Sequence, residues 1–129
     1  MDIFVQVIEG YTYKAGMAKL PISISIESDV PVEVAEKIDI NSVALVKPGD
    51  PDFFLGFSRS ITSIHRNSMV IDQKHPYRKE VDVLEDEDAC DPLAPGKYQV
   101  RVDVTVFRKN SSGFTAEVLS KAIPLEICN

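Results

Sequence analysis

The side chains with the clearest chemical potential form an acidic segment in the second half of the chain. Glu85, Asp86, Asp88 and Asp91 lie close together there, with no basic residue among them. Carboxylate oxygens are the ligands that Ca²⁺ prefers, so these residues predict a calcium site if the segment is a loop. Their spacing matches no defined calcium-binding loop, and the alternative is a solvated loop that aids solubility. Asp50 and Asp52 are the carboxylates that a calcium site could recruit from another turn.

The two cysteines, Cys90 and Cys128, permit one intramolecular disulfide. If residues 98–107 and 114–127 form neighbouring antiparallel strands, Cys90 precedes the first strand and Cys128 follows the second at the same end of the sheet. Closing that loop would stabilise the fold by roughly 3 to 4 kcal/mol in the chain-entropy model. The alternative is two reduced thiols. A disulfide would indicate a location outside the cytoplasm, whereas reduced thiols would indicate the cytoplasm.

Other metal and catalytic chemistry finds little support. His65 and His75 are the only histidines, and neither has the spacing to cysteine that a structural zinc or a copper site requires. No serine or cysteine lies in a recognisable nucleophile elbow. We therefore predict that the protein is not an enzyme and that it carries no cofactor other than the calcium considered above.

Length and charge predict one soluble domain over residues 1–129. A chain of 129 residues removes about two thirds of its unfolded surface from water, which suffices for one core. The net charge is −6, and the only basic grouping, Lys74, Arg78 and Lys79, is too scattered for a nucleic-acid partner. No apolar run reaches the roughly 18 residues of a membrane-spanning helix, so membrane insertion is not expected.

The N-terminal residues do not resemble a signal peptide, because they lack a basic region and a small-residue cleavage site. Two interpretations remain open. Either the native chain stays in the cytoplasm, or Met1 was added to a mature or excised segment.

Strict alternation of apolar and polar residues predicts half-buried β-strands, because successive side chains of a strand point to opposite faces. Residues 20–27 and 98–106 show this pattern most clearly. Weaker strands are expected at 3–8, 38–46, 53–64, 69–71 or 77–84, and 114–127. Proline- and glycine-rich segments at 47–52, 91–96 and 110–113 predict the turns between them. The pattern of short strands with frequent turns is typical of a sandwich or barrel.

Two segments depart from simple alternation. A short helix near 31–37, capped by Asp29, competes with an extended connection that places Val30, Val32 and Val34 on one side. The last strand changes phase, since its apolar residues are even-numbered at first and odd-numbered after residue 122. A β-bulge near Ser120 and Lys121 would reconcile the two halves.

The segment at 93–102, Leu-Ala-Pro-Gly-Lys-Tyr-Gln-Val-Arg-Val, resembles the tyrosine corner of fibronectin type III and other immunoglobulin-like domains. The resemblance implies an all-β, immunoglobulin-like Greek-key β-sandwich of about seven strands, in which the hydroxyl of Tyr98 bonds the backbone a few residues upstream. It covers only these ten residues, and the chain lacks the core tryptophan usual in those families. A plain turn followed by a strand is the alternative. The resemblance implies no particular activity, because this fold hosts many.

The densest apolar segment, residues 53–57, offers a possible contact surface. Alternation would bury its odd-numbered residues and expose Phe54. An exposed Phe54 beside Tyr11 and Tyr13 could seed a contact with another protein, since aromatic side chains dominate interface energetics.

These observations favour a non-enzymatic protein-interaction module that presents loops or an edge strand to a protein partner. Edge strands carry unpaired N–H and C=O groups, so strand addition, including homo-oligomerisation, is available to such a fold. The alternatives are a calcium-dependent adhesion or binding domain that uses the 85–91 loop, and a structural subunit of a larger assembly.

Overall fold

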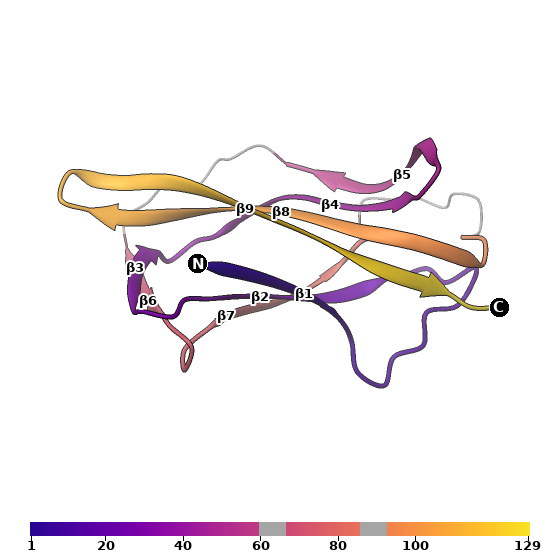
Figure 1. Cartoon of the computed structure of the whole chain (residues 1–129), viewed down its shortest axis with the longest axis horizontal. Helices are drawn as coiled ribbons and strands as arrows, with labels where there is room; N and C mark the ends of the chain where they lie inside the picture. The colour runs from indigo at the N-terminus through magenta and orange to yellow at the C-terminus, as the bar shows by residue number, and fades with distance from the viewer. Residues whose placement is uncertain (60–66, 86–92) are drawn as a thin grey trace.

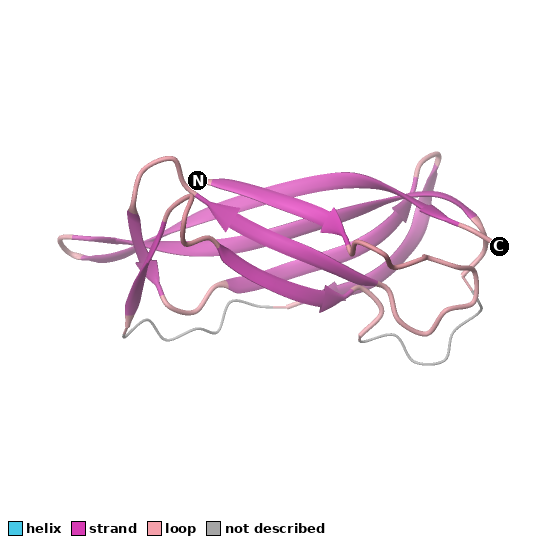
Figure 2. Cartoon of the chain, turned by 90° about the horizontal axis from the view of Figure 1, so that it is seen from below, coloured by secondary structure: helices cyan, strands magenta, loops and turns pink. Residues whose placement is uncertain are grey.

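A computed structural model describes residues 1–59, 67–85 and 93–129. Within these ranges the chain forms β-strands and no helix, which confirms the predicted all-β class (Figure 2). The strands are β1 (Asp2–Val7), β2 (Pro21–Glu27), β3 (Val32–Ala35), β4 (Asp39–Lys47), β5 (Asp50–Ser58), β6 (Ser68–Ile71), β7 (Tyr77–Asp82), β8 (Gly96–Asn110) and β9 (Gly113–Ile127).

The strands lie in two antiparallel layers, consistent with a β-sandwich (Figure 1). One layer has the order β1-β2-β7. In the other, β8 is central, with β9 along one edge and β4 followed by β5 on the opposite edge. Beyond Asp39, the first residue of β4, β3 meets β8 at the pair Val34–Arg108, and β6 pairs with β3. The β8–β9 hairpin extends past β3 and β6 at the left of Figure 1.

The core lies between the layers, where the two alternating segments identified in the sequence face each other. Ile22, Ile24 and Ile26 of β2 are fully buried, as are the valines from 100 to 106 in β8. Burying one such aliphatic side chain stabilises the fold by about 1.5–3 kcal/mol. The strict alternation in both strands therefore fixes which face of each layer is inside.

The helix considered near 31–37 is wrong, because residues 32–35 form the strand β3. Val32 and Val34 point into the core, with exposed fractions of 8% and 0%. Their register with β6 pairs Val32 with Ile71, and β-branched residues pack well on such a pleated surface. Both alternatives for the middle of the chain, 69–71 and 77–84, contain strands, so the described residues hold nine strands rather than about seven.

The bulge predicted near Ser120 and Lys121 is also wrong. β9 pairs with β8 without a register shift from the pair Gly96–Ile127 to the pair Asn110–Gly113. The odd-numbered apolar residues Leu119, Ile123, Leu125 and Ile127 are half-buried or buried, whereas Val118, an even-numbered residue, is 65% exposed. The phase change in the sequence therefore reflects apolar residues on the solvent face, not an inserted residue.

Two buried tyrosines fasten connecting segments to the strands. Tyr98 donates a hydrogen bond to the carbonyl of Ala94, four residues upstream, with an O···O distance of 2.6 Å. Tyr13 accepts a hydrogen bond from the N–H of Ile8 at 3.0 Å and donates one to the carbonyl of Pro21. The second tyrosine holds the 8–20 connection against the sandwich.

Candidate functional site

The predicted calcium site lies mostly outside the described residues, since these do not include Asp86, Asp88 or Asp91. Glu85 is described, and its carboxylate forms an ion pair with Arg59 at 3.2 Å. Asp50 accepts a hydrogen bond from the N–H of Asp52 at the start of β5. Among the described residues, no cluster of three or more acids, histidines or cysteines could hold a metal ion.

The predicted disulfide has one partner outside the described ranges, because these omit Cys90. Cys128 is exposed. Its main chain pairs with the 8–20 connection: Cys128 N–H donates to Tyr13 at 2.9 Å, and Ala15 N–H donates to Cys128 at 2.7 Å. These bonds anchor the end of β9 whatever the state of the thiol.

Of the two histidines considered for metal binding, His65 lies outside the described residues and His75 is in the turn between β6 and β7. Its N–H and its Nδ1 lie 2.7 Å and 3.1 Å from Oδ1 of Asp72. The N–H of His75, followed by its ring and the N–H of Lys74, lowers the pKa of the Asp72 carboxyl below its ordinary value. These contacts stabilise the turn between β6 and β7, and they already engage Oδ1 of Asp72.

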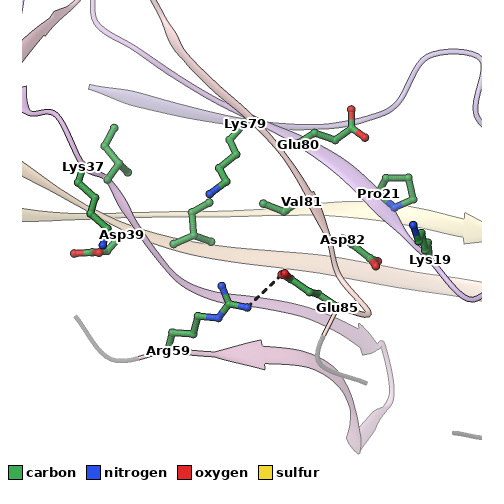
Figure 3. A pocket seen from close by; sticks show the side chains of 12 residues that line it. Lys19, Pro21, Lys37, Asp39, Arg59, Lys79, Glu80, Val81, Asp82 and Glu85 are labelled. Carbon is green, nitrogen blue, oxygen red and sulfur yellow. Dashed lines mark hydrogen bonds and ion pairs between the residues drawn. The ribbon is translucent and has the colours of Figure 1, made fainter. Parts of the chain in front are cut away.

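A hollow of about 940 Å³ opens between β7 and the start of β4 (Figure 3). Its charged lining consists of Lys19, Lys37, Arg59 and Lys79 with Asp39, Glu80, Asp82 and Glu85. The charges balance, and several have structural partners. Figure 3 shows Arg59 and Glu85 pointing toward each other, and Asp82 accepts from the N–H groups of Leu20 and Leu84 at 2.8 Å and 3.0 Å. Nothing in this arrangement singles out a nucleophile or a proton-transfer group.

The predicted aromatic surface is wrong in one member. Phe54 is 54% exposed and Tyr11 is 38% exposed, but Tyr13 is only 6% exposed, because its hydroxyl bonds the backbone on both sides. Phe54 also lies on β5, which β4 and β8 separate from β9, whereas the tyrosines lie beside the end of β9. The three residues therefore do not form one surface.

The feature that the sequence did not reveal is the outer edge of β9. Cys128 bonds to Tyr13 and Ala15, on the side away from β8. Because the main-chain groups of successive strand residues point to alternate sides, even-numbered residues of β9 direct their N–H and C=O groups outward. In the part of the chain that the structure describes, no backbone hydrogen bond reaches this edge at Ala116, Val118, Ser120 or Ala122.

Pro124 fits this geometry, because it too is even-numbered. Its missing N–H would point away from β8, so the proline costs no hydrogen bond within the sheet. With Cys128 already paired, the outward backbone groups from Ala116 to Ala122 have no backbone hydrogen-bond partner among the described residues. The even number of Pro124 is a sequence signal for which main-chain groups of β9 point away from β8, because proline has no N–H to donate within a sheet.

A groove of about 370 Å³ runs beside this edge, between residues 1–4 and residues 118–121. Phe4 and Val118, both on its walls, are 38% and 65% exposed. The groove therefore combines exposed apolar side chains with outward main-chain donors and acceptors, which are the two elements of a strand-binding site.

A scan against protein-family models and searches of curated proteins and of solved structures find no match to this chain. The described residues include no helix that is long and apolar enough to cross a membrane.

Proposed function

We propose that this chain is a non-enzymatic protein-interaction module of immunoglobulin-like topology, and that a protein partner adds a strand to the outer edge of β9. The observation that carries the proposal is the row of outward main-chain groups on β9 beside an apolar groove. An added strand would satisfy these groups, and alternate side chains of that strand would enter the groove.

The strand order supports the immunoglobulin-like part of the proposal. The layers β1-β2-β7 and β9-β8-β4-β5 support it, because an immunoglobulin-like Greek key also divides its strands between two such sheets. The hydrogen bond from Tyr98 to Ala94 lies at the entry to the penultimate strand, where such domains carry their tyrosine corner.

The length and composition of β9 distinguish it from the other edge strands. β9 has 15 residues, whereas β5 has nine, and β1 and β7 have six each. β5 begins with Asp50, Pro51 and Asp52, and charges and prolines of this kind protect an edge from pairing. In β9, residues 116–124 contain only two charged side chains, both odd-numbered. β9 also carries Pro124, but its outward-bonding residues from Ala116 to Ala122 include no proline and no charge, and such a long edge segment is expected to have a partner.

Val118→Pro tests the proposal with the full chain used as bait. Proline at this even-numbered position removes an outward N–H and leaves the pairing with β8 intact, so stability should change by less than about 1 kcal/mol. Val118→Ala is the matched control, because it shortens the side chain and keeps the N–H. We expect capture of partners, including untagged copies of the chain, to fall about tenfold for Val118→Pro, as loss of a strand hydrogen bond predicts.

Quantitative mass spectrometry of partners captured from an extract of the native source measures this difference, and thermal melting verifies that both variants fold. The proposal fails if Val118→Pro captures the same partners at wild-type levels, or if the wild-type chain captures no partner and no copy of itself.

A further inference from the structure

We infer that the strand added to β9 is β9 of a second copy of this chain, antiparallel about a two-fold axis at Leu119. This inference rests on the proposed function, because it names the occupant of the same edge. A two-fold dimer is the commonest symmetric assembly, and it requires a surface that is complementary to itself. The outer edge of β9 meets that requirement in one register.

The charged residues of the edge select that register. Glu117 and Lys121 lie two residues on either side of Leu119. With the axis at Leu119, each Glu117 faces Lys121 of the second copy, and the pair occurs twice. An axis at residue 117 or 121 would instead place like charges opposite each other, which destabilises a sheet.

The same register satisfies the main chain. It places Ala116 opposite Ala122 of the second copy and Val118 opposite Ser120, so outward-facing residues meet outward-facing residues. Each of these pairs exchanges two hydrogen bonds, which gives about eight between the copies. The ladder ends at Pro124, which has no N–H to donate, and it stops short of the segment in which Cys128 bonds to Tyr13 and Ala15. β1 lies beside β9 here across the groove, but among the described residues no backbone hydrogen bond uses the outward groups of Ala116, Val118, Ser120 and Ala122.

The proposed register also determines what the inward-facing side chains of β9 would meet. In this register the Leu119 side chains of the two copies lie side by side across the axis, next to the groove between residues 1–4 and 118–121. Glu117 Oε2 is buried, has no hydrogen-bond partner among the described residues and lies 3.6 Å from Arg108, so it is the other oxygen of this half-exposed carboxylate that would meet a second cation. Lys121 of the second copy is that cation.

Disulfide trapping tests both the edge and the register. In a Cys90→Ser/Cys128→Ser background, we expect Leu119→Cys to form a covalent dimer in a glutathione redox buffer, because directly opposite residues meet the distance for a disulfide. Val118→Cys is the matched control, since it faces Ser120 of the second copy rather than itself. Preferential cross-linking of Val118→Cys, or no cross-linking of either variant above the cysteine-free background, would overturn the inference.

Charge reversal gives a second readout that needs no cysteine. Lys121→Glu places a second carboxylate opposite Glu117, and we expect the dimer to dissociate about tenfold more readily in sedimentation experiments. The compensating pair Glu117→Lys/Lys121→Glu should recover part of the lost affinity, because it restores opposite charges between the copies but places a lysine beside Arg108. A chain that remains monomeric at its highest soluble concentration overturns the second copy as occupant. If Val118→Pro then still abolishes capture of another protein, the proposed function stands and only its partner has been misassigned.

Discussion

Gly56→Ala is expected to destabilise the fold by about 3 kcal/mol, because glycine is required here by both conformation and space. Gly56 has φ = +153° in β5, and a Cβ added to it would lie 2.0 Å from the carbonyl oxygen of Val43 and 2.8 Å from Cα of Ala44. Those atoms belong to the backbone of β4, which cannot move without disturbing its pairing with β8. β5 would have to separate from β4 locally.

Urea denaturation of Gly56→Ala measures the loss, and Gly49→Ala is the matched control. Gly49 also has positive φ, +85°, but nothing lies within 4 Å of an added Cβ. Its substitution should therefore show only the backbone strain, about 1 kcal/mol. Equal stabilities for the two variants would mean that the close approach of β5 to β4 does not exist in solution.

Tyr13→Phe is expected to cost about 2 kcal/mol, because it leaves the N–H of Ile8 and the carbonyl of Pro21 without their hydrogen-bond partner. The ring stays buried, so the loss isolates the hydroxyl. Burial is the largest influence on this phenol and raises its pKa above the ordinary value of 10.0. The hydroxyl therefore remains a donor at neutral pH.

The neighbouring tyrosine supplies the control for this prediction. The hydroxyl of Tyr11 lies 3.5 Å from the carbonyl of Lys19 in an exposed position, so Tyr11→Phe should change stability by less than about 0.5 kcal/mol. Thermal or urea denaturation of both variants gives the comparison. A loss in Tyr11→Phe equal to that in Tyr13→Phe would contradict the role assigned to Tyr13.

The predictable part of the fold was the part in which burial follows a simple period. Residues 20–27 and 98–106 alternate strictly, and each became a strand whose inward residues are fully buried. The turns predicted within 47–52 and 110–113 lie between strands, because glycine and proline act locally. Residues 91 and 92 of the turn predicted at 91–96 lie outside the described residues. These features need no knowledge of what each strand packs against.

The predictions were wrong where tertiary contacts determine the secondary structure or the burial of a residue. Val32 and Val34 allowed a helix locally, and it is pairing with β6 that makes them a strand. Val118 looked like a core residue, although β9 presents it to solvent. Tyr13 looked like a surface aromatic, but the carbonyl of Pro21 and the N–H of Ile8 bury its hydroxyl. In each case the decisive partner is distant in sequence or has no signature of its own.

The sequence predicts the type of binding site, an edge strand, but not which strand forms it. An edge strand was expected to bind a partner, but nothing in the sequence alone identified β9 as that edge. Its open side follows from the bonds between Cys128 and the 8–20 connection, a contact between opposite ends of the chain. Only when the outward-bonding residues of β9 are known can the positions of Glu117, Lys121 and Pro124 be used to infer how a second strand would pair with this edge.

Hydrogen–deuterium exchange of the β9 amides, followed by NMR at several protein concentrations, tests most directly whether this edge pairs with a strand. In dilute solution we expect slow exchange at Leu119 and Lys121, which bond to β8, and fast exchange at Val118, Ser120 and Ala122. At high concentration the latter three should become protected as well. Protection of these three amides that is already complete in the monomer, or that is absent in a dimer, would contradict the account.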